Sequence, residues 1–288
     1  MTLREFINTC MERLAPLYPE PEAKSIAFRL LEHYTDIPSY KYISEPDLVV
    51  DASEVAPLVA AIDELETGRP LQYVLGVTEF CGHRFKVGEG CLIPRPETEE
   101  LVSRIIDDLY ADQADGQPDT VDDDGPFNIL DLCTGSGCIA WSLAAEFPEA
   151  MVYGCDLSDA ALRYACKQRV KVGGAKPIFF TADVLAAPPA GLPQFDVIVS
   201  NPPYICVSER ADMRPNVVNF EPVEALFVPD EDPLCFYKAI ARWADALLRP
   251  DGHIYLEINE RFGPEVAALF PGSAVYPDIS GRDRFVIR

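Results

Sequence analysis

The sequence predicts an α/β protein in which a small helical N-terminal domain precedes a larger domain built on a mostly parallel sheet. Apolar residues recur at helical spacing over roughly the first seventy residues, and short apolar runs broken by glycines follow. From residue 128 onward apolar strands alternate with helices, which is typical of a parallel sheet covered on both faces. With 288 residues, 48% of them hydrophobic, the chain has room for both cores.

Capping residues and apolar periodicity predict a helical N-terminal domain. Apolar residues repeat every three to four positions, and Ser, Thr or Gly stands where helices commonly begin or end. The signals are a capping box at Thr2 and Glu5, a helix from Pro21 to Tyr34, N-caps at Ser44 and Ser53, and a helical run from Val55 to Leu65 stopped by Gly68.

A linker and an insertion separate the expected domains. Residues 72–93 form short apolar and aromatic runs between glycines, which suggests a β-hairpin. Pro94 and Pro96 then precede a periodic helix. Residues 112–126 are rich in Asp, Gly and Pro and indicate a flexible insertion, to which we assign no chemistry. We therefore expect a helical domain (1–74), a hairpin linker (75–93) and a sheet domain (94–288).

Seven strands are expected in the sheet domain. The last two are too close together for a helical crossover, so they should pair antiparallel. The predicted strands are Ile129–Leu132, Val152–Cys155, Ile178–Thr181, Val197–Ser200, His253–Ile258, Ala274–Tyr276 and Arg284–Ile287.

Composition argues against several classes of protein. A formal net charge of −23 opposes binding to phosphate backbones, so we expect no direct contact with nucleic acid. No apolar run approaches a membrane span, and the first residues do not resemble a signal peptide, so we expect a cytoplasmic protein without membrane contact. Nine cysteines without a Cys-x-x-Cys pair are expected to be reduced, and three scattered histidines predict no metal site.

The segment Asn201-Pro202-Pro203-Tyr204 ends the apolar run Phe195–Ser200. A buried strand that stops at two prolines presents its last residues at the carboxyl edge of a sheet, where open α/β folds bind ligands. The amide oxygen of Asn201, a backbone carbonyl and an aromatic ring can hold a planar NH2 group by both protons and by stacking. Hydrogen bonds to both protons draw the lone pair of that nitrogen out of conjugation. An amide nitrogen needs this before it can attack a methyl group. Alternatively, the segment is only a strand-ending turn.

A second candidate site is the loop after the first predicted strand. It consists of Cys133, Thr134, Gly135, Ser136 and Gly137 and leads directly into a predicted helix. Glycines before a helix N-terminus let a ligand approach the backbone closely. A nicotinamide-binding dehydrogenase would share this arrangement, but the loop does not match the Gly-x-Gly-x-x-Gly fingerprint.

Two carboxylates follow the next two strands. Asp156 ends the second strand, where it would accept both hydroxyls of a ribose, or else begin a helix beside Ser158. Asp183 follows the third strand and would accept the amino group of an adenine while Val184 packs on the ring, although Asp183 fits a plain loop residue nearly as well.

In order and spacing, these motifs resemble the S-adenosylmethionine-dependent methyltransferases with the seven-stranded, Rossmann-like class I fold. Four further segments are similar to the HemK/PrmC family, whose members methylate the side-chain nitrogen of a glutamine in peptide chain release factors. Together the motifs span nearly the whole sequence. The four segments are Gly68–Tyr73, Ile93–Glu99, Phe220-Glu221-Pro222 and Gly281-Arg282-Asp283-Arg284.

The resemblance implies a cofactor, a substrate and roles for individual residues. S-adenosylmethionine would be the methyl donor and S-adenosylhomocysteine its product. Asn201 and Pro202 would grip the amide of a glutamine in a Gly-Gly-Gln motif, and Pro203 and Tyr204 would shape the slot. The helical domain would bind the release factor, and we expect a monomer. The implied cofactor contacts are Thr134, Gly135, Gly137, Asp156, Val184 and Asn201, and we add Cys133, Ser136 and Asp183 from the loops themselves.

The sequence departs from the family pattern at a few positions, and rival functions remain open. The family usually has glycine where Cys133 and Asn259 stand, and a glycine-rich segment where residues 228–232 stand. An adenine-N6 or guanine-N2 methyltransferase acting on nucleic acid would use the same slot. A non-catalytic module that keeps the fold and the cofactor is a third possibility.

Overall fold

The computed structural model describes residues 1–114 and 125–288, so most of the predicted insertion at 112–126 lies outside the described residues. The protein forms two compact units. The helical unit comprises Met1–Val77 together with Arg214–Phe220, and the sheet unit comprises Thr78–Met213 together with Glu221–Arg288. No helix in the described ranges is long and apolar enough to cross a membrane.

Apolar faces of three longer helices build the core of the helical unit. Leu3, Phe6, Ile7 and Leu14 of the first helix are fully buried there. The capping box is confirmed, because the Thr2 hydroxyl accepts from the Glu5 amide and the Glu5 carboxylate accepts from the Thr2 amide. The helices are α1 (Leu3–Leu14), α2 (Glu20–Thr35), α3 (Lys41–Ser44), α4 (Ala52–Glu66), α5 (Leu71–Leu75) and the distant α9 (Pro215–Val218).

Two expected N-caps are wrong. Ser44 is the last residue of α3 rather than a cap. Helix α4 is capped by Asp51, whose carboxylate accepts the amide of Ser53 at 2.8 Å, so Ser53 lies inside the helix. A carboxylate is as good a cap as a hydroxyl and stands two residues earlier, so it starts the helix sooner. The hairpin is also shorter than expected, since residues 71–75 are helical and its strands are β1 (Val77–Phe80) and β2 (His83–Lys86).

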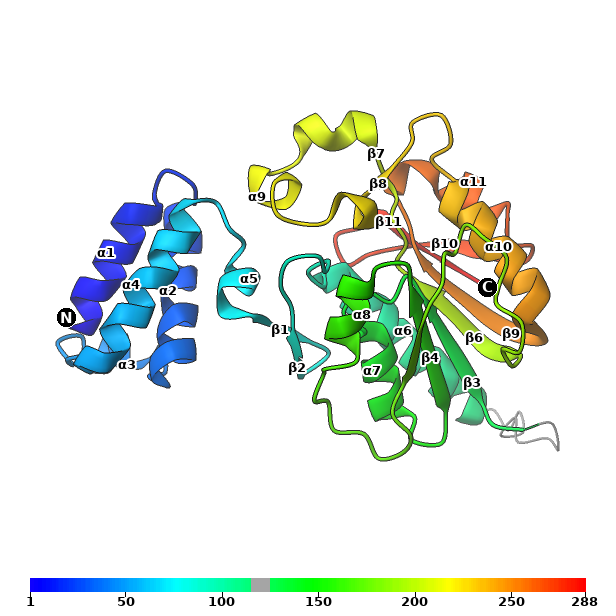
Figure 1. Ribbon diagram of the computed structural model, residues 1–288, viewed down its shortest axis with the longest axis horizontal. Helices are drawn as coiled ribbons and strands as arrows, with labels where there is room; N and C mark the ends of the chain where they lie inside the picture. The colour runs from blue at the N-terminus through cyan, green and yellow to red at the C-terminus, as the bar shows by residue number, and fades with distance from the viewer. Residues whose placement is uncertain (115–124) are drawn as a thin grey trace. The chain divides into compact units, whose positions relative to one another are not determined.

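All seven predicted strands form one sheet in the order β10-β11-β9-β6-β3-β4-β5 (Figure 1). Neighbours are parallel except at β11, which is antiparallel to both β9 and β10, as the short connection between the last two strands predicted. Two short strands, β7 (Ile205–Cys206) and β8 (Phe227–Val228), form a separate pair that sequence patterns did not predict. The strands of the sheet are β3 (Asn128–Leu132), β4 (Met151–Asp156), β5 (Ile178–Thr181), β6 (Phe195–Ser200), β9 (Leu248–Glu257), β10 (Ala274–Pro277) and β11 (Asp283–Ile287).

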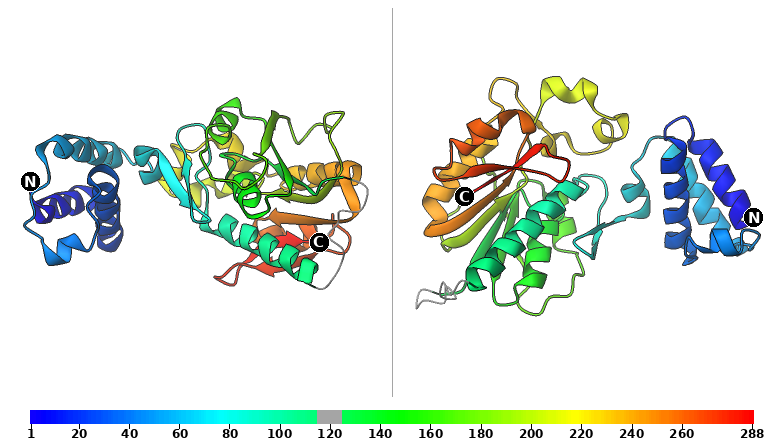
Figure 2. Two further views of the ribbon diagram at one scale, coloured as in Figure 1. Left: turned by 90° about the horizontal axis from the view of Figure 1, so that it is seen from below. Right: turned by 180° about the vertical axis from the view of Figure 1, so that it is seen from behind.

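Helices pack on both faces of this sheet, and α6 and α10 lie on opposite sides of it (Figure 2). Alternate residues of one strand enter different cores, because side chains alternate across a strand. Ile129 packs with α6 and α7, whereas Leu130 packs with α10. The helices are α6 (Pro96–Ala114), α7 (Cys138–Glu146), α8 (Asp159–Ala165), α10 (Cys235–Leu247) and α11 (Gly263–Ala267), with short 3-10 turns at Val207–Asp212, Val223–Ala225 and Glu260–Phe262.

Strand order reverses between β3 and β6. From β3 the polypeptide proceeds outward through β4 and β5, and then returns to the other side of β3 with β6 and β9. Loops leaving the carboxyl ends of two such strands diverge to opposite faces and leave a crevice between them. The fold therefore places a crevice where both candidate segments, 133–137 and 201–204, begin.

Candidate active site

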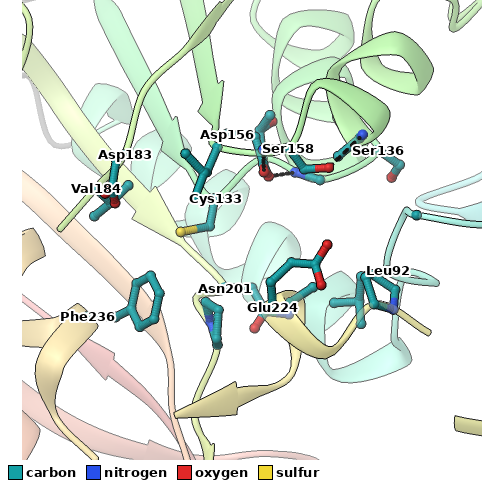
Figure 3. Close-up of a pocket in the computed structure, with 18 of the residues that line it drawn as sticks. Leu92, Cys133, Ser136, Asp156, Ser158, Asp183, Val184, Asn201, Glu224 and Phe236 are labelled. Carbon is teal, nitrogen blue, oxygen red and sulfur yellow. Dashed lines mark hydrogen bonds between the residues drawn. The ribbon is translucent and has the colours of Figure 1, made fainter. Parts of the chain in front are cut away.

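A cavity of about 660 Å³ lies at the carboxyl ends of the parallel strands. Each of four neighbouring strands contributes to its wall: Cys133 follows β3, Asp156 ends β4, Asp183 follows β5 and Asn201 follows β6. Figure 3 shows these side chains around a common space, which Phe236 and Glu224 also line on either side of Asn201. The structure thus brings residues from both predicted sites into one cavity.

The loop 133–137 turns through left-handed backbone at three positions. Gly135 and Gly137 have φ of 56° and 77°, which glycine adopts without penalty. Cys133 has φ of 60°, a conformation that costs a residue with a Cβ roughly 1–2 kcal/mol. Thr134 anchors the loop to the end of β3, because its hydroxyl donates to Asp131 Oδ2 at 2.5 Å. All five loop residues except Gly137 line the cavity.

Asp156 is held by the main chain. Its Oδ2 accepts the amide of Gly135 at 2.8 Å and its Oδ1 accepts the amide of Ser158 at 2.9 Å. Ser158 itself caps α8, so Asp156 stands both beside a helix start and at the cavity wall. Burial raises the pKa of Asp156, and the backbone hydrogen bonds oppose that rise. Each carboxylate oxygen keeps a lone pair for a hydroxyl group.

The loop after β5 combines an exposed carboxylate with a buried apolar side chain. Asp183 is exposed and its carboxylate accepts the amide of Leu185 at 2.9 Å. Val184 is only 3% exposed, and both residues line the cavity. The ring of Phe236, from the first turn of α10, lies on the same side of the cavity in Figure 3. Together Val184 and Phe236 supply apolar surface suited to a flat heterocycle.

Asn201 is half-buried at the cavity wall, and its side-chain Nδ2 donates to Thr98 Oγ1 at 3.0 Å. Pro203 also lines the cavity. Pro202 and Tyr204 are not among its lining residues: Pro202 is buried, and the Tyr204 hydroxyl donates to Glu257 Oε1 at 2.8 Å. Burial, followed by the nearby Glu257 carboxylate, raises the pKa of Tyr204 well above its usual range.

Sequence reasoning assigned no role to several residues that build this site. Thr98, Glu224 and Phe236 line the cavity from segments far from either motif. Glu221, only 4% exposed, accepts the Ile93 amide at 3.0 Å and pairs with Arg95 at 2.5 Å, which ties the start of α6 to the segment before β8. The family motifs at residues 93–99 and 220–222 include Thr98 and Glu221, whereas no sequence signal marked Glu224 or Phe236.

The charges of the cavity wall favour a cation. Asp156, Asp183 and Glu224 line it, and no Lys, Arg or His is among the lining residues of the described ranges. A phosphate group would meet like charge here, whereas a cationic nucleoside would be attracted. Within the same ranges, no three His, Cys, Asp or Glu side chains are grouped so as to hold a metal ion.

Comparisons with known proteins agree with this geometry. Residues 5–76 match the family described as PrmC N-terminal domain, and residues 119–218 match the methyltransferase small domain. A relative from Bacteroides thetaiotaomicron named release factor glutamine methyltransferase is 37% identical over 96% of this protein and 95% of its own length. One of the same name from Flavobacterium psychrophilum is 35% identical over 99% of this protein and 98% of its own length.

Among solved structures, TrmN from Thermus thermophilus is 20% identical, with a TM-score of 0.42 over 90% of this protein and 76% of that one. A similarity of this degree is too distant to bear on function.

Proposed function

The protein belongs to the release factor glutamine methyltransferase family, and from that premise we propose that it methylates a glutamine side chain of a peptide chain release factor. The methyl group comes from S-adenosylmethionine, the acceptor is the side-chain amide nitrogen (N5), and the glutamine belongs to a Gly-Gly-Gln motif. Such methylation would modulate translation termination.

The observation that carries this proposal is the position of Asn201. It stands where β6 ends, at the wall of a cavity that can accept a nucleoside, and its Nδ2 is already engaged by Thr98. Its Oδ1 is therefore the atom left to accept a proton from an NH2 group. A glutamine amide presents such a group.

The residues present fit S-adenosylmethionine. Gly135 lines the cavity, and a Cβ added there would meet no protein atom within 4 Å, so its backbone is open to a ligand. Asp156 would take the ribose hydroxyls, while Asp183 and Val184 would hold the adenine. The carboxylates of the wall suit the positive charge of the cofactor. When bound, the cofactor supplies a sulfonium methyl group, which is electrophilic without further activation.

The protein's own task is then to hold and orient the amide. Asn201 Oδ1 and the carbonyl of Pro202 would accept the two amide N–H groups, which draws the nitrogen lone pair out of conjugation. Pro203 and Tyr204 would shape the slot around the glutamine. No base is required beforehand, because the spare proton becomes acidic only after the nitrogen is substituted. This agrees with a cavity wall whose described residues include no histidine.

The same slot would admit an exocyclic amine of adenine or guanine, but three observations favour the glutamine. The net charge of −23 and the acidic cavity wall both repel a phosphate backbone. The relatives that match nearly the whole sequence are named for release factors.

We also propose roles for the parts of the protein. Residues 1–74 would bind the release factor, residues 75–93 would link the domains, and residues 94–288 would bind the cofactor and carry out the transfer. The substrate is a protein that works at the ribosome, so we place the enzyme in the cytoplasm, acting as a monomer without contacting nucleic acid itself.

The test is to incubate the purified protein with radiolabelled S-adenosylmethionine and a release factor. We expect label in the release factor, and mass mapping of its tryptic digest should place one added methyl group on the glutamine of Gly-Gly-Gln. A release factor with that glutamine replaced by alanine is the matched control. Label in total RNA, or in the alanine variant, would contradict the proposal.

A further inference from the structure

The side chain of Asn201 ends a directed series of hydrogen bonds. Asn201 Nδ2 donates to Thr98 Oγ1 at 3.0 Å, and Thr98 Oγ1 donates to Glu257 Oε2 at 2.7 Å. The other carboxylate oxygen, Glu257 Oε1, accepts the hydroxyl of Tyr204 at 2.8 Å. These four residues come from the start of α6, the end of β6, the turn after it, and the end of β9.

Which group donates and which accepts in each of these hydrogen bonds follows from the number of protons that each group carries. A threonine hydroxyl has one proton, and Thr98 gives it to the carboxylate, so toward Asn201 it can only accept. The NH2 group of Asn201 can donate to this oxygen of Thr98. The oxygen of Asn201 in the same place would instead point at a lone pair of Thr98 and be repelled. Thr98 therefore specifies which way round the carboxamide stands, and Oδ1 is turned away from Thr98.

Glu257 is built into the fold as an acceptor. It is 1% exposed, and hydrogen bonds from Thr98 and Tyr204 occupy both of its oxygens. Burial raises the pKa of Glu257, while those two hydrogen bonds and the Arg284 guanidinium oppose the rise. Arg284 is itself positioned by Asp278, which also accepts the amides of Ser280 and Arg282.

We propose that Thr98 and Glu257 are positioning residues that hold the Asn201 carboxamide with its oxygen toward the substrate, and so select an amide over a carboxylate. This inference rests on the proposed function. It also gives a role to the motifs at residues 93–99 and 281–284, which contribute Thr98 and Arg284 and which the reaction itself does not use.

Glu257→Gln is the sharpest test, because it keeps the size of the side chain while it removes the charge and replaces one acceptor oxygen by a donor NH2 group. Tyr204 still donates to the remaining oxygen, so the new NH2 group faces Thr98. Thr98 must then accept from residue 257 and give its own proton to Asn201 Oδ1. The carboxamide turns over and presents its NH2 group to the substrate. That group repels an amide NH2 and attracts a carboxylate.

The readout is a preference between two release factors, one with Gly-Gly-Gln and one with glutamate in place of that glutamine. Both dissociation constants are measured by calorimetry in the presence of S-adenosylhomocysteine, and methyl transfer is measured separately. We expect Glu257→Gln to change the glutamine-to-glutamate preference by about tenfold or more toward glutamate, and to slow methyl transfer by a similar factor.

Thr98→Val and Thr98→Ser are a matched pair. The valine variant removes the hydroxyl at nearly constant size, so the preference should fall as the carboxamide becomes free to turn. The serine variant keeps the hydroxyl and should restore the preference of the wild type. Circular dichroism and cofactor affinity check that each variant is folded.

An unchanged preference in folded Glu257→Gln and Thr98→Val would overturn the inference, and so would a parallel loss of affinity for both release factors. A wild-type protein that methylates no release factor would overturn the proposed function, and the inference with it. These results are distinguishable because the first two require an active wild type.

Discussion

The two sides of the cavity are held by different means. On the proposed cofactor side, the Asp156 carboxylate accepts backbone amides of Gly135 and Ser158. On the proposed substrate side, the Asn201 carboxamide is held by the Thr98 side chain, which depends in turn on Glu257. Backbone donors are present whatever the side chains are, whereas a series of side-chain hydrogen bonds fails when one hydroxyl is lost. Cofactor binding should therefore depend on loop shape, and glutamine selection on a few individual atoms.

Replacing Asn201 should give the largest difference between the effects on substrate turnover and on cofactor binding. We expect Asn201→Ala to lower kcat for the release factor by about 100-fold, because positioned groups of this kind typically contribute that much. Cofactor affinity should weaken by far less, since the loops 133–137 and 156–158 are untouched. Methyl-transfer kinetics and calorimetry with S-adenosylhomocysteine measure the two effects. Normal methylation by the purified variant would show that Asn201 does not hold the substrate.

Asp156→Asn is the reverse experiment. An asparagine NH2 group would face one of the backbone amides that the carboxylate now accepts, leaving that donor without a partner and disturbing the loop. We expect the dissociation constant for the cofactor to rise by about tenfold or more. Measured with saturating cofactor, kcat should stay near the wild-type value. If kcat fell as far as in Asn201→Ala, the two sides would not be separable.

The cofactor side also contains one buried group whose charge depends on pH. Burial raises the pKa of Asp131 to about 7, and its Oδ1 has no hydrogen-bond partner in the described ranges. The folded protein thus keeps a proton that the unfolded state releases near pH 4, and this group's contribution to stability is lost as pH rises from about 4 to about 7.

Asp131→Asn removes that titration. We expect the unfolding free energy of the wild type, relative to the variant, to fall by up to about 1.4 kcal/mol per pH unit across this window. Denaturant unfolding of both proteins between pH 4 and pH 8 measures the difference. A difference that does not vary with pH would show that Asp131 is charged throughout.

Cys133 should give the smallest effect. Its left-handed backbone favours glycine, so Cys133→Gly should be more stable than Cys133→Ala by about 1 kcal/mol, because only the alanine keeps the Cβ. The alanine variant controls for the lost thiol. Melting temperatures and cofactor affinities of the pair provide the test, and an alanine variant at least as stable as the glycine one would contradict it.

Much of the fold could be predicted because its signals are local. The strand β6 is fully buried around the apolar run Val197-Ile198-Val199, and Thr2 and Glu5 form a cap within one helical turn. Errors arose where neighbouring signals compete, as at Asp51 and Ser53, or where an element has only a few residues. The two-residue strands β7 and β8 pair across 22 positions of the sequence, and no periodicity can be seen in two residues.

The site was predictable only at strand ends, where topology brings side chains together. Asp156 and Asn201, which both line the cavity, could be predicted as candidates because each follows an apolar run. Thr98 lies 159 residues from Glu257 in the sequence, so no spacing rule connects them. One signal was available: Glu257 is a single carboxylate within the apolar run 253–258, and an ionisable group in a buried strand needs a partner.

The acidic wall of the cavity also bears on turnover. Asp156, Asp183 and Glu224 attract a positively charged ligand, and among the described residues no lining cation offsets them. Once its methyl group is gone, the spent cofactor carries one positive charge fewer, so this attraction weakens. If the cavity binds S-adenosylmethionine as proposed, the same carboxylates hold the methyl donor more strongly than the spent product, which favours release of the product.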